Sequence, residues 1–255
     1  MRNVRVLAAE FLGTFALTFF GAASIVTVAA LRAAQLGPTA TANTITRSFG
    51  PEGIIFIALA HAIVLAVMIT ALGHISGGHF NPAITAAALI GRHIEPVLAG
   101  LYVVTQLVAG VVAAFLLKYL YPADFLTLVK WGAPAPAVDT GRAFVIEAIL
   151  TFFLVLVFYA VAIDRQGAFN RVAGFGIGLV LLFDILIGGP LTGAAMNPAR
   201  AFGPSLLAGI VDLNHLVIYW LGPLVGAALA GVLYQNVLLG RDEPSDLPPP
   251  SEGAV

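Results

Sequence analysis

The apolar residues of this chain gather in long runs, and the charged residues lie mostly between them. A helix needs about 20 apolar residues to cross the hydrocarbon core of a bilayer. We read six runs as transmembrane helices: residues 6–31, 54–72, 96–117, 143–163, 172–187 and 216–239.

Two further apolar pieces are too short to span a membrane. Residues 81–91 and 197–208 hold 11 and 12 residues, which at about 1.5 Å per residue reach across only about half a bilayer. Residues 241–255 are rich in Pro, Asp and Glu and lack apolar periodicity, so we expect a disordered tail there.

Composition agrees with a membrane protein. Hydrophobic residues make up 60% of the chain and charged residues only 10%, well outside the range of soluble globular proteins. The net charge of -1 makes nucleic acid an implausible partner. With no cysteines, disulfides, thiolate metal sites and thiol nucleophiles are excluded. We expect one integral domain over residues 1–240.

An internal repeat divides this domain into two halves. Gly73–Ala83 reads GHISGGHFNPA and Gly189–Ala199 reads GPLTGAAMNPA, with the two Asn residues 116 positions apart. Each half also begins with a span that carries a glutamate, Glu10 or Glu147. The repeats cover about residues 6–120 and 143–240. Three spans per repeat force the second copy to enter the membrane upside down, so the repeats are inverted and meet near the midplane.

The Asn-Pro-Ala tripeptides have a helix-starting chemistry. Asn caps a helix, Pro fits its first turn without wasting an amide, and Ala allows close approach. A single such tripeptide is usually an ordinary turn, but two copies at matching places favour two half-helices. Their positive dipole ends would point into one place and repel cations. The residues are Asn81, Pro82 and Ala83, and Asn197, Pro198 and Ala199.

The segments SGGHFNPA and TGAAMNPARAFGP resemble the paired signature of the aquaporin and major intrinsic protein superfamily, over about residues 6–240. The stretch FDILIGGPLTGAAMNPARAFGP is especially similar to plant tonoplast intrinsic proteins. The resemblance implies an all-α hourglass bundle of six transmembrane helices and two re-entrant half-helices. It also implies a homotetramer with one pore per subunit and both termini in the cytoplasm. Among membranes, we favour the plasma membrane.

The resemblance also assigns a selectivity filter to four positions: His61, Ile185, Ala194 and Arg200. Strict water channels resemble a Phe, His, small residue and Arg arrangement. In this chain the Phe is absent and Ile185 replaces a bulky polar ring, so the selectivity filter should be wider and less polar on one side. Arg200 would orient water and oppose cations. A lone His in a span can instead be an interhelical donor, which is the alternative for His61.

Four leucines occupy matching places in the two repeats: Leu17, Leu65, Leu154 and Leu181. They fit an apolar pore wall, or equally a lipid-facing or core position.

Three span acids need a role. Glu10 and Glu147 could relay protons, but the resemblance makes them acceptors for the amides of the re-entrant loops, which we favour. Asp184 neighbours Ile185 and should point about 100° away from the pore, so we expect a structural partner for it.

Three classes of function compete: a channel, an ion-coupled transporter and an intramembrane enzyme. A transporter needs ionisable residues along its path, and none of the span acids is expected to face the pore. An enzyme or metal site is not indicated by His74, Ser76 and His79, since GHISG lacks the spacing of a nucleophile elbow. We expect no cofactor.

Within the channel class, glycerol facilitators are the alternative. They resemble Asn-Pro-Ala-Arg-Asp with a basic residue four positions later, whereas this chain has Ala201 and Ser205. They also place Pro and an aliphatic residue where Tyr219 and Trp220 stand. The sequence therefore predicts a passive channel for water and small neutral solutes such as ammonia or hydrogen peroxide, in contact with lipid and closed to protons and ions.

Overall fold

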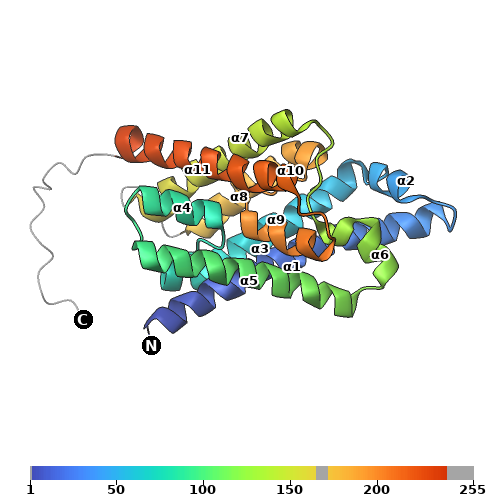
Figure 1. The fold of residues 1–255 in the computed structure, drawn as a ribbon, viewed down its shortest axis with the longest axis horizontal. Coiled ribbons are helices and arrows are strands. Elements are labelled where there is room, and N and C mark those ends of the chain that lie inside the picture. Colours follow the sequence, from blue (N-terminus) through green and yellow to red (C-terminus); the bar gives the residue numbers. More distant parts are fainter. Residues whose placement is uncertain (1, 165–171, 240–255) are drawn as a thin grey trace, which may run out of the picture.

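The computed structural model describes residues 2–164 and 172–239, and these residues form helices joined by short loops (Figure 1). The first half contains α1 (Arg2–Leu36), α2 (Ala42–Arg47), α3 (Gly50–Ser76), α4 (Pro82–Ile90), α5 (Pro96–Leu120), α6 (Ala123–Leu128) and the 3₁₀ turn η1 (Lys130–Gly132). The second half contains α7 (Thr140–Phe158), η2 (Tyr159–Ile163), α8 (Ala173–Thr192), α9 (Pro198–Leu207), α10 (Leu213–Leu216), η4 (Val217–Leu221), α11 (Gly222–Leu233) and η5 (Tyr234–Leu238).

Within the described residues, six helical segments are long and apolar enough to cross a membrane. They coincide with the six predicted runs and extend past most of them, α1 for example from Arg2 to Leu36 where residues 6–31 were expected. The extra turns are more polar than the apolar run that the prediction relied on. The half-helices α4 and α9 match the two short runs. The expected disordered tail lies outside the described residues.

The spans pack into one bundle with the half-helices enclosed. Helix α3 packs against α1 and α8, and α7 packs against α8 and α11. The start of α1 and the end of α11 lie at the same end of the bundle, whereas α2 and α6 lie at the other end (Figure 1). Half-helix α4 packs on α11, and α9 packs on α5. Each half-helix therefore rests on a span of the opposite repeat.

Matching glycines end the spans that lead into the half-helices. Gly77 caps α3 with φ 89° and Gly193 caps α8 with φ 86°, a left-handed conformation that glycine adopts without steric cost. The chain then runs irregularly until Asn81 and Asn197 start α4 and α9. These two re-entrant loops bring non-helical backbone into the protein interior, where it is shielded from lipid.

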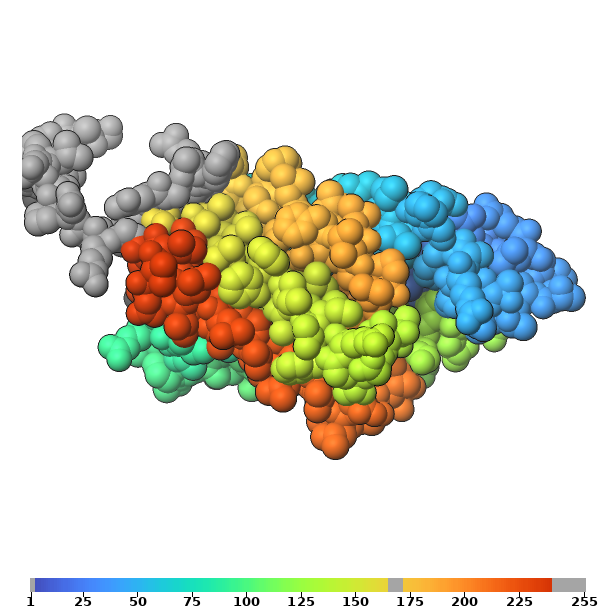
Figure 2. Space-filling model, turned by 90° about the horizontal axis from the view of Figure 1, so that it is seen from above, coloured from blue at the N-terminus to red at the C-terminus, as the bar shows by residue number. Residues whose placement is uncertain are grey.

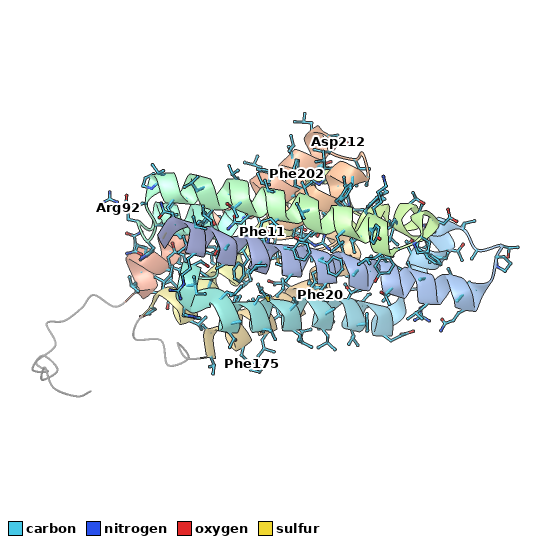
Figure 3. The ribbon with its side chains drawn as sticks, turned by 90° about the horizontal axis from the view of Figure 1, so that it is seen from below. Phe11, Phe20, Arg92, Phe175, Phe202 and Asp212 are labelled. Carbon is cyan, nitrogen blue, oxygen red and sulfur yellow. The ribbon has the colours of Figure 1, made fainter. Side chains whose placement is uncertain are left out.

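The outer surface is apolar and several polar side chains are buried inside, as expected for a lipid-embedded bundle. Phe20 on α1 and Phe175 on α8 are 53% and 64% exposed, and Figure 3 shows them along the bundle, with Arg92 at one end. By contrast, Glu10 and Gln106 are fully buried. The space-filling view shows an elongated molecule with the segment around α2 projecting at one end (Figure 2).

Candidate functional site

The two Asn-Pro-Ala motifs meet inside the bundle. Asn81 Nδ2 donates to the carbonyl oxygen of Met196 at 2.9 Å, and Asn197 Nδ2 donates to the carbonyl oxygen of Phe80 at 2.8 Å. Each Asn also caps its own half-helix: Asn81 Oδ1 accepts the amide of Ala83 at 2.8 Å, and Asn197 Oδ1 accepts that of Ala199 at 3.0 Å. The positive ends of both half-helices therefore face the same region.

The residue before each motif holds a left-handed backbone. Phe80 has φ 48° and Met196 has φ 51°, unusual values for residues with side chains. In this conformation the amide of each residue donates to the glutamate of its own repeat, at 2.7 Å and 2.8 Å. Its carbonyl accepts from the Asn of the other repeat. The strained backbone thus serves both contacts at once.

Glu10 and Glu147 are buried beneath the two loops. Glu147 accepts from the hydroxyl of Thr192 at 2.6 Å and from the amides of Ala195 at 3.0 Å and Met196 at 2.8 Å. Glu10 accepts the equivalent set, from Ser76 at 2.7 Å, His79 at 3.0 Å and Phe80 at 2.7 Å. Both side chains hold the loops that carry the Asn residues.

The first repeat has an additional donor that sequence reasoning missed. Gln106 is fully buried in α5, and its Nε2 donates to Glu10 Oε2 at 2.8 Å and to Thr85 Oγ1 at 3.1 Å. In the second repeat Gly222 approaches the glutamate instead, and a Cβ added there would lie 3.2 Å from Glu147 Cβ. A polar residue in an otherwise apolar span was the available signal.

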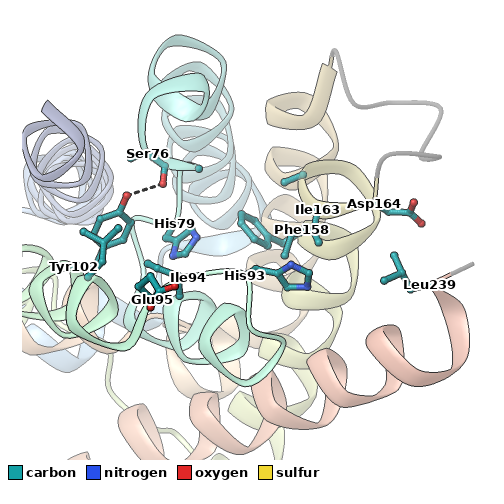
Figure 4. Close-up of a pocket in the computed structure, with 13 residues that line it drawn as sticks. Ser76, His79, His93, Ile94, Glu95, Tyr102, Phe158, Ile163, Asp164 and Leu239 are labelled. Carbon is teal, nitrogen blue, oxygen red and sulfur yellow. Dashed lines mark hydrogen bonds between the residues drawn. The ribbon is translucent and has the colours of Figure 1, made fainter. Parts of the chain in front are cut away.

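Three cavities that share lining residues lie in succession along the bundle. An inner vestibule of about 700 Å³ is lined by His79, His93 and Glu95, among others (Figure 4). The loop between α4 and α5, which carries His93, lies at the same end of the bundle as the start of α1 (Figure 1). An outer vestibule of about 900 Å³ opens beside Arg47 and Lys130 at the opposite end.

A narrow passage of about 20 Å³ separates the vestibules. It shares His79 with the inner vestibule and shares His61 and Arg200 with the outer one. This volume holds about one water molecule. The three cavities therefore mark one path through the bundle, with a constriction the size of about one water molecule between the two vestibules.

The predicted site residues lie along this path. The leucines Leu17, Leu65, Leu154 and Leu181 line the narrow passage together with Asn81 and Asn197. Ala194 also lines the passage, and Ile185 lines the outer vestibule next to it.

His61 and Arg200 sit where the passage meets the outer vestibule, and both are nearly fully buried. Arg200 Nη2 lies 3.3 Å from His61 Nε2, and His61 Nδ1 lies 2.9 Å from the carbonyl oxygen of Ile57. This geometry fits the tautomer in which Nδ1 donates to Ile57 and Nε2 accepts from Arg200. Arg200 Nη1 is buried and has no hydrogen-bond partner among the described residues.

Asp184 is buried, and its Oδ2 makes no hydrogen bond. That Asp184 has a structural partner and points away from the pore stays a prediction. Among the described residues, no group of three or more His, Asp or Glu side chains could hold a metal ion.

Comparisons with known proteins agree with this architecture. The family model described as major intrinsic protein matches residues 1–234. Probable aquaporin TIP3-2 of Arabidopsis thaliana is 41% identical over 242 residues, which cover 93% of this chain and 85% of that protein. Aquaporin TIP4-4 of Zea mays is 38% identical over 249 residues, which cover 96% of this chain and 91% of that protein. The X-ray structure of the aquaglyceroporin from Plasmodium falciparum superposes with a TM-score of 0.76 and covers 92% of this chain and 97% of that chain. At 22% sequence identity this likeness supports the fold alone.

Proposed function

Because the chain belongs to the major intrinsic protein family, we propose that it conducts water together with small neutral solutes such as ammonia or hydrogen peroxide and excludes protons and other ions. As a family member it is a passive channel and not an enzyme. The observation that carries the solute proposal is the narrow passage that ends at His61 and Arg200.

The filter residues account for the choice of solute. His61 and Arg200 offer hydrogen-bonding groups on one side, while Ile185 and Ala194 offer only apolar surface. A solute that is less polar than water gives up less hydration free energy than water does when it enters such a half-apolar ring. The four filter residues do not include the Phe that strict water channels resemble, which leaves room for ammonia or hydrogen peroxide. Glycerol should pass poorly, because the passage holds about one water molecule.

Ion exclusion has two sources in this proposal. The positive ends of α4 and α9 meet beside Asn81 and Asn197, and Arg200 adds a full charge. An ion in the passage would also lose most of its hydrating water molecules, and the leucine side chains have no polar groups to take their place. Glu10 and Glu147 each accept hydrogen bonds from loop amides and a hydroxyl, and Glu10 also accepts one from Gln106, so we assign both a structural role.

Assembly and location are part of the proposal. We expect a homotetramer with both termini on the cytoplasmic side of a membrane that the chain spans several times. The TIP-type relatives point to a vacuolar membrane rather than to the plasma membrane favoured above. Fractionation of the source cells decides between these two membranes.

The test is a comparison of solute fluxes in proteoliposomes. Stopped-flow measurements with the wild-type protein should give permeability to water and to ammonia or hydrogen peroxide above that of empty liposomes, with glycerol near the background. The double variant H61F/I185H narrows the ring, so it should keep much of the water permeability and lose most of the ammonia or peroxide permeability. An unchanged ratio would remove the filter assignment, and ion currents comparable to the water flux would contradict the mechanism.

A further inference from the structure

The ring of His61 lies against the backbone of α1 at a single glycine. A Cβ added to Gly21 would lie 2.7 Å from Cδ2 and 2.9 Å from Cε1 of His61, and closer still to Nε2. Carbon atoms do not approach each other this closely without a shift of one partner. The position of the ring therefore depends on Gly21 having no side chain.

The other contacts of His61 lie on its own helix and at the passage. Its Nδ1 is held by the carbonyl of Ile57 one turn earlier on α3, and α3 packs along α1. The remaining side of His61 lines the narrow passage and the outer vestibule beside Arg200. A side chain on Gly21 would push the ring away from α1 and into the path of the solute.

The inverted repeat indicates that the fold itself does not require this glycine. Gly21 and Phe158 each follow the glutamate of their repeat by 11 residues, and His61 and Ile177 each precede the Asn of their repeat by 20. In the second repeat the α7 position thus carries a large buried ring, Phe158, and its α8 counterpart carries Ile177. In the first repeat the arrangement is reversed: the ring, His61, is on α3, and Gly21 on α1 leaves the space for it.

We propose that Gly21 is a positioning residue of the filter, which lets His61 lie back against α1 and keeps the opening wide enough for neutral solutes larger than water. This inference rests on the proposed function, because it presumes that His61 borders the solute path. Gly21 is not among the residues that line the narrow passage or the outer vestibule, so it acts only through His61.

The experiment compares G21A with G100A, both in reconstituted vesicles. Gly100 lies on α5, and a Cβ there meets no atom within 4 Å, so G100A controls for an added methyl group in a span. We expect G100A to match the wild type. In G21A the ratio of hydrogen peroxide to water permeability should fall about tenfold, at the low end of what one methyl group does to discrimination in a tight pocket.

A rescue variant separates positioning from general damage. If Gly21 acts through the ring, G21A/H61A should show the same permeability ratio as H61A alone, and this comparison holds even if G21A by itself fails to reach the membrane. An unchanged ratio in G21A, or a difference between G21A/H61A and H61A, overturns the proposal. A wild-type protein that conducts no water would instead overturn the proposed function.

Discussion

Arg200 brings a positive charge to a constriction whose other walls are mostly apolar. One of its terminal nitrogens is bound to His61 and the other has no protein partner. A unit charge about 5 Å from a passing cation repels it by roughly 3 kcal/mol at an effective dielectric constant of about 20. This contribution adds to the field of the two half-helix ends.

Replacing Arg200 by Val should therefore admit cations. We expect the sodium or proton conductance of R200V vesicles to rise roughly hundredfold, the factor that corresponds to about 3 kcal/mol. Electrical recording or a pH-sensitive dye measures it. R142V is the matched control, because Arg142 is an exposed arginine paired with Asp139 outside the passage. If R200V conducts cations no better than R142V, the half-helix ends alone form the barrier.

At this scale the sequence predicted the residues that the repeat duplicates. Asn81 and Asn197, which bind each other's loops, were recognisable because the same motif occurs twice at matching positions. Gln106 and Gly21 have different residues at their matching positions, so repetition could not reveal them. Their partners also lie far away in the sequence, and only the packing of α1 against α3 and α5 brings them together.

Among the helices, the contact of α9 with α5 is made backbone to backbone. A Cβ on Gly203 would overlap the carbonyl group of Gly110 and would lie 2.9 Å from the amide nitrogen of Val111. Small residues allow membrane helices to approach this closely. Arg200 lies on α9 and Asn197 caps its first turn, so a shift of α9 would move both residues relative to the passage.

Alanine at Gly203 should force α9 away from α5. We expect G203A to lose about 1–3 kcal/mol of stability through overpacking and to conduct less water than the wild type. Thermal unfolding in detergent and stopped-flow permeability measure the two effects. G176A is the control, since a Cβ on Gly176 would be 3.5 Å from Val161, an ordinary contact. Equal behaviour of the two variants would show that α9 tolerates a shift.

The elements themselves were largely predictable, because a bilayer demands long apolar runs and half-length runs cannot cross it. The short helices α2 and α6 were not predicted. Each has only six residues in a connecting segment, too few for an apolar run to mark them. The π-helical turn η4 was also missed. Tyr102 donates to the carbonyl oxygen of Ser76 at the end of α3, and Tyr219, which lies in η4, donates to that of Thr192 at the end of α8. The two tyrosines are 117 residues apart, although the two Asn-Pro-Ala motifs are 116 apart, and the π-helical turn accommodates the extra residue.

Across the whole molecule, neither half is complete alone. Half-helix α4 packs on α11, α9 packs on α5, and each Asn donates to the other half's loop. A chain cut between η1 and α7 should therefore behave as two mutually dependent pieces. We expect residues 1–138 and 139–255 to yield a water-permeable channel when co-expressed, and neither piece to do so alone. Water conduction by one piece would contradict this dependence.

The crossed Asn contacts also impose a waiting time during synthesis. The acceptor of Asn81 is Met196, 115 residues later in the chain. At a translation rate of about 5–20 residues per second, roughly 6–23 seconds pass before that carbonyl has been made. During this interval the first re-entrant loop has its own glutamate as an anchor but lacks its crossed partner. Glu10, with its fourth donor from Gln106, is thus the anchor of the half that must wait.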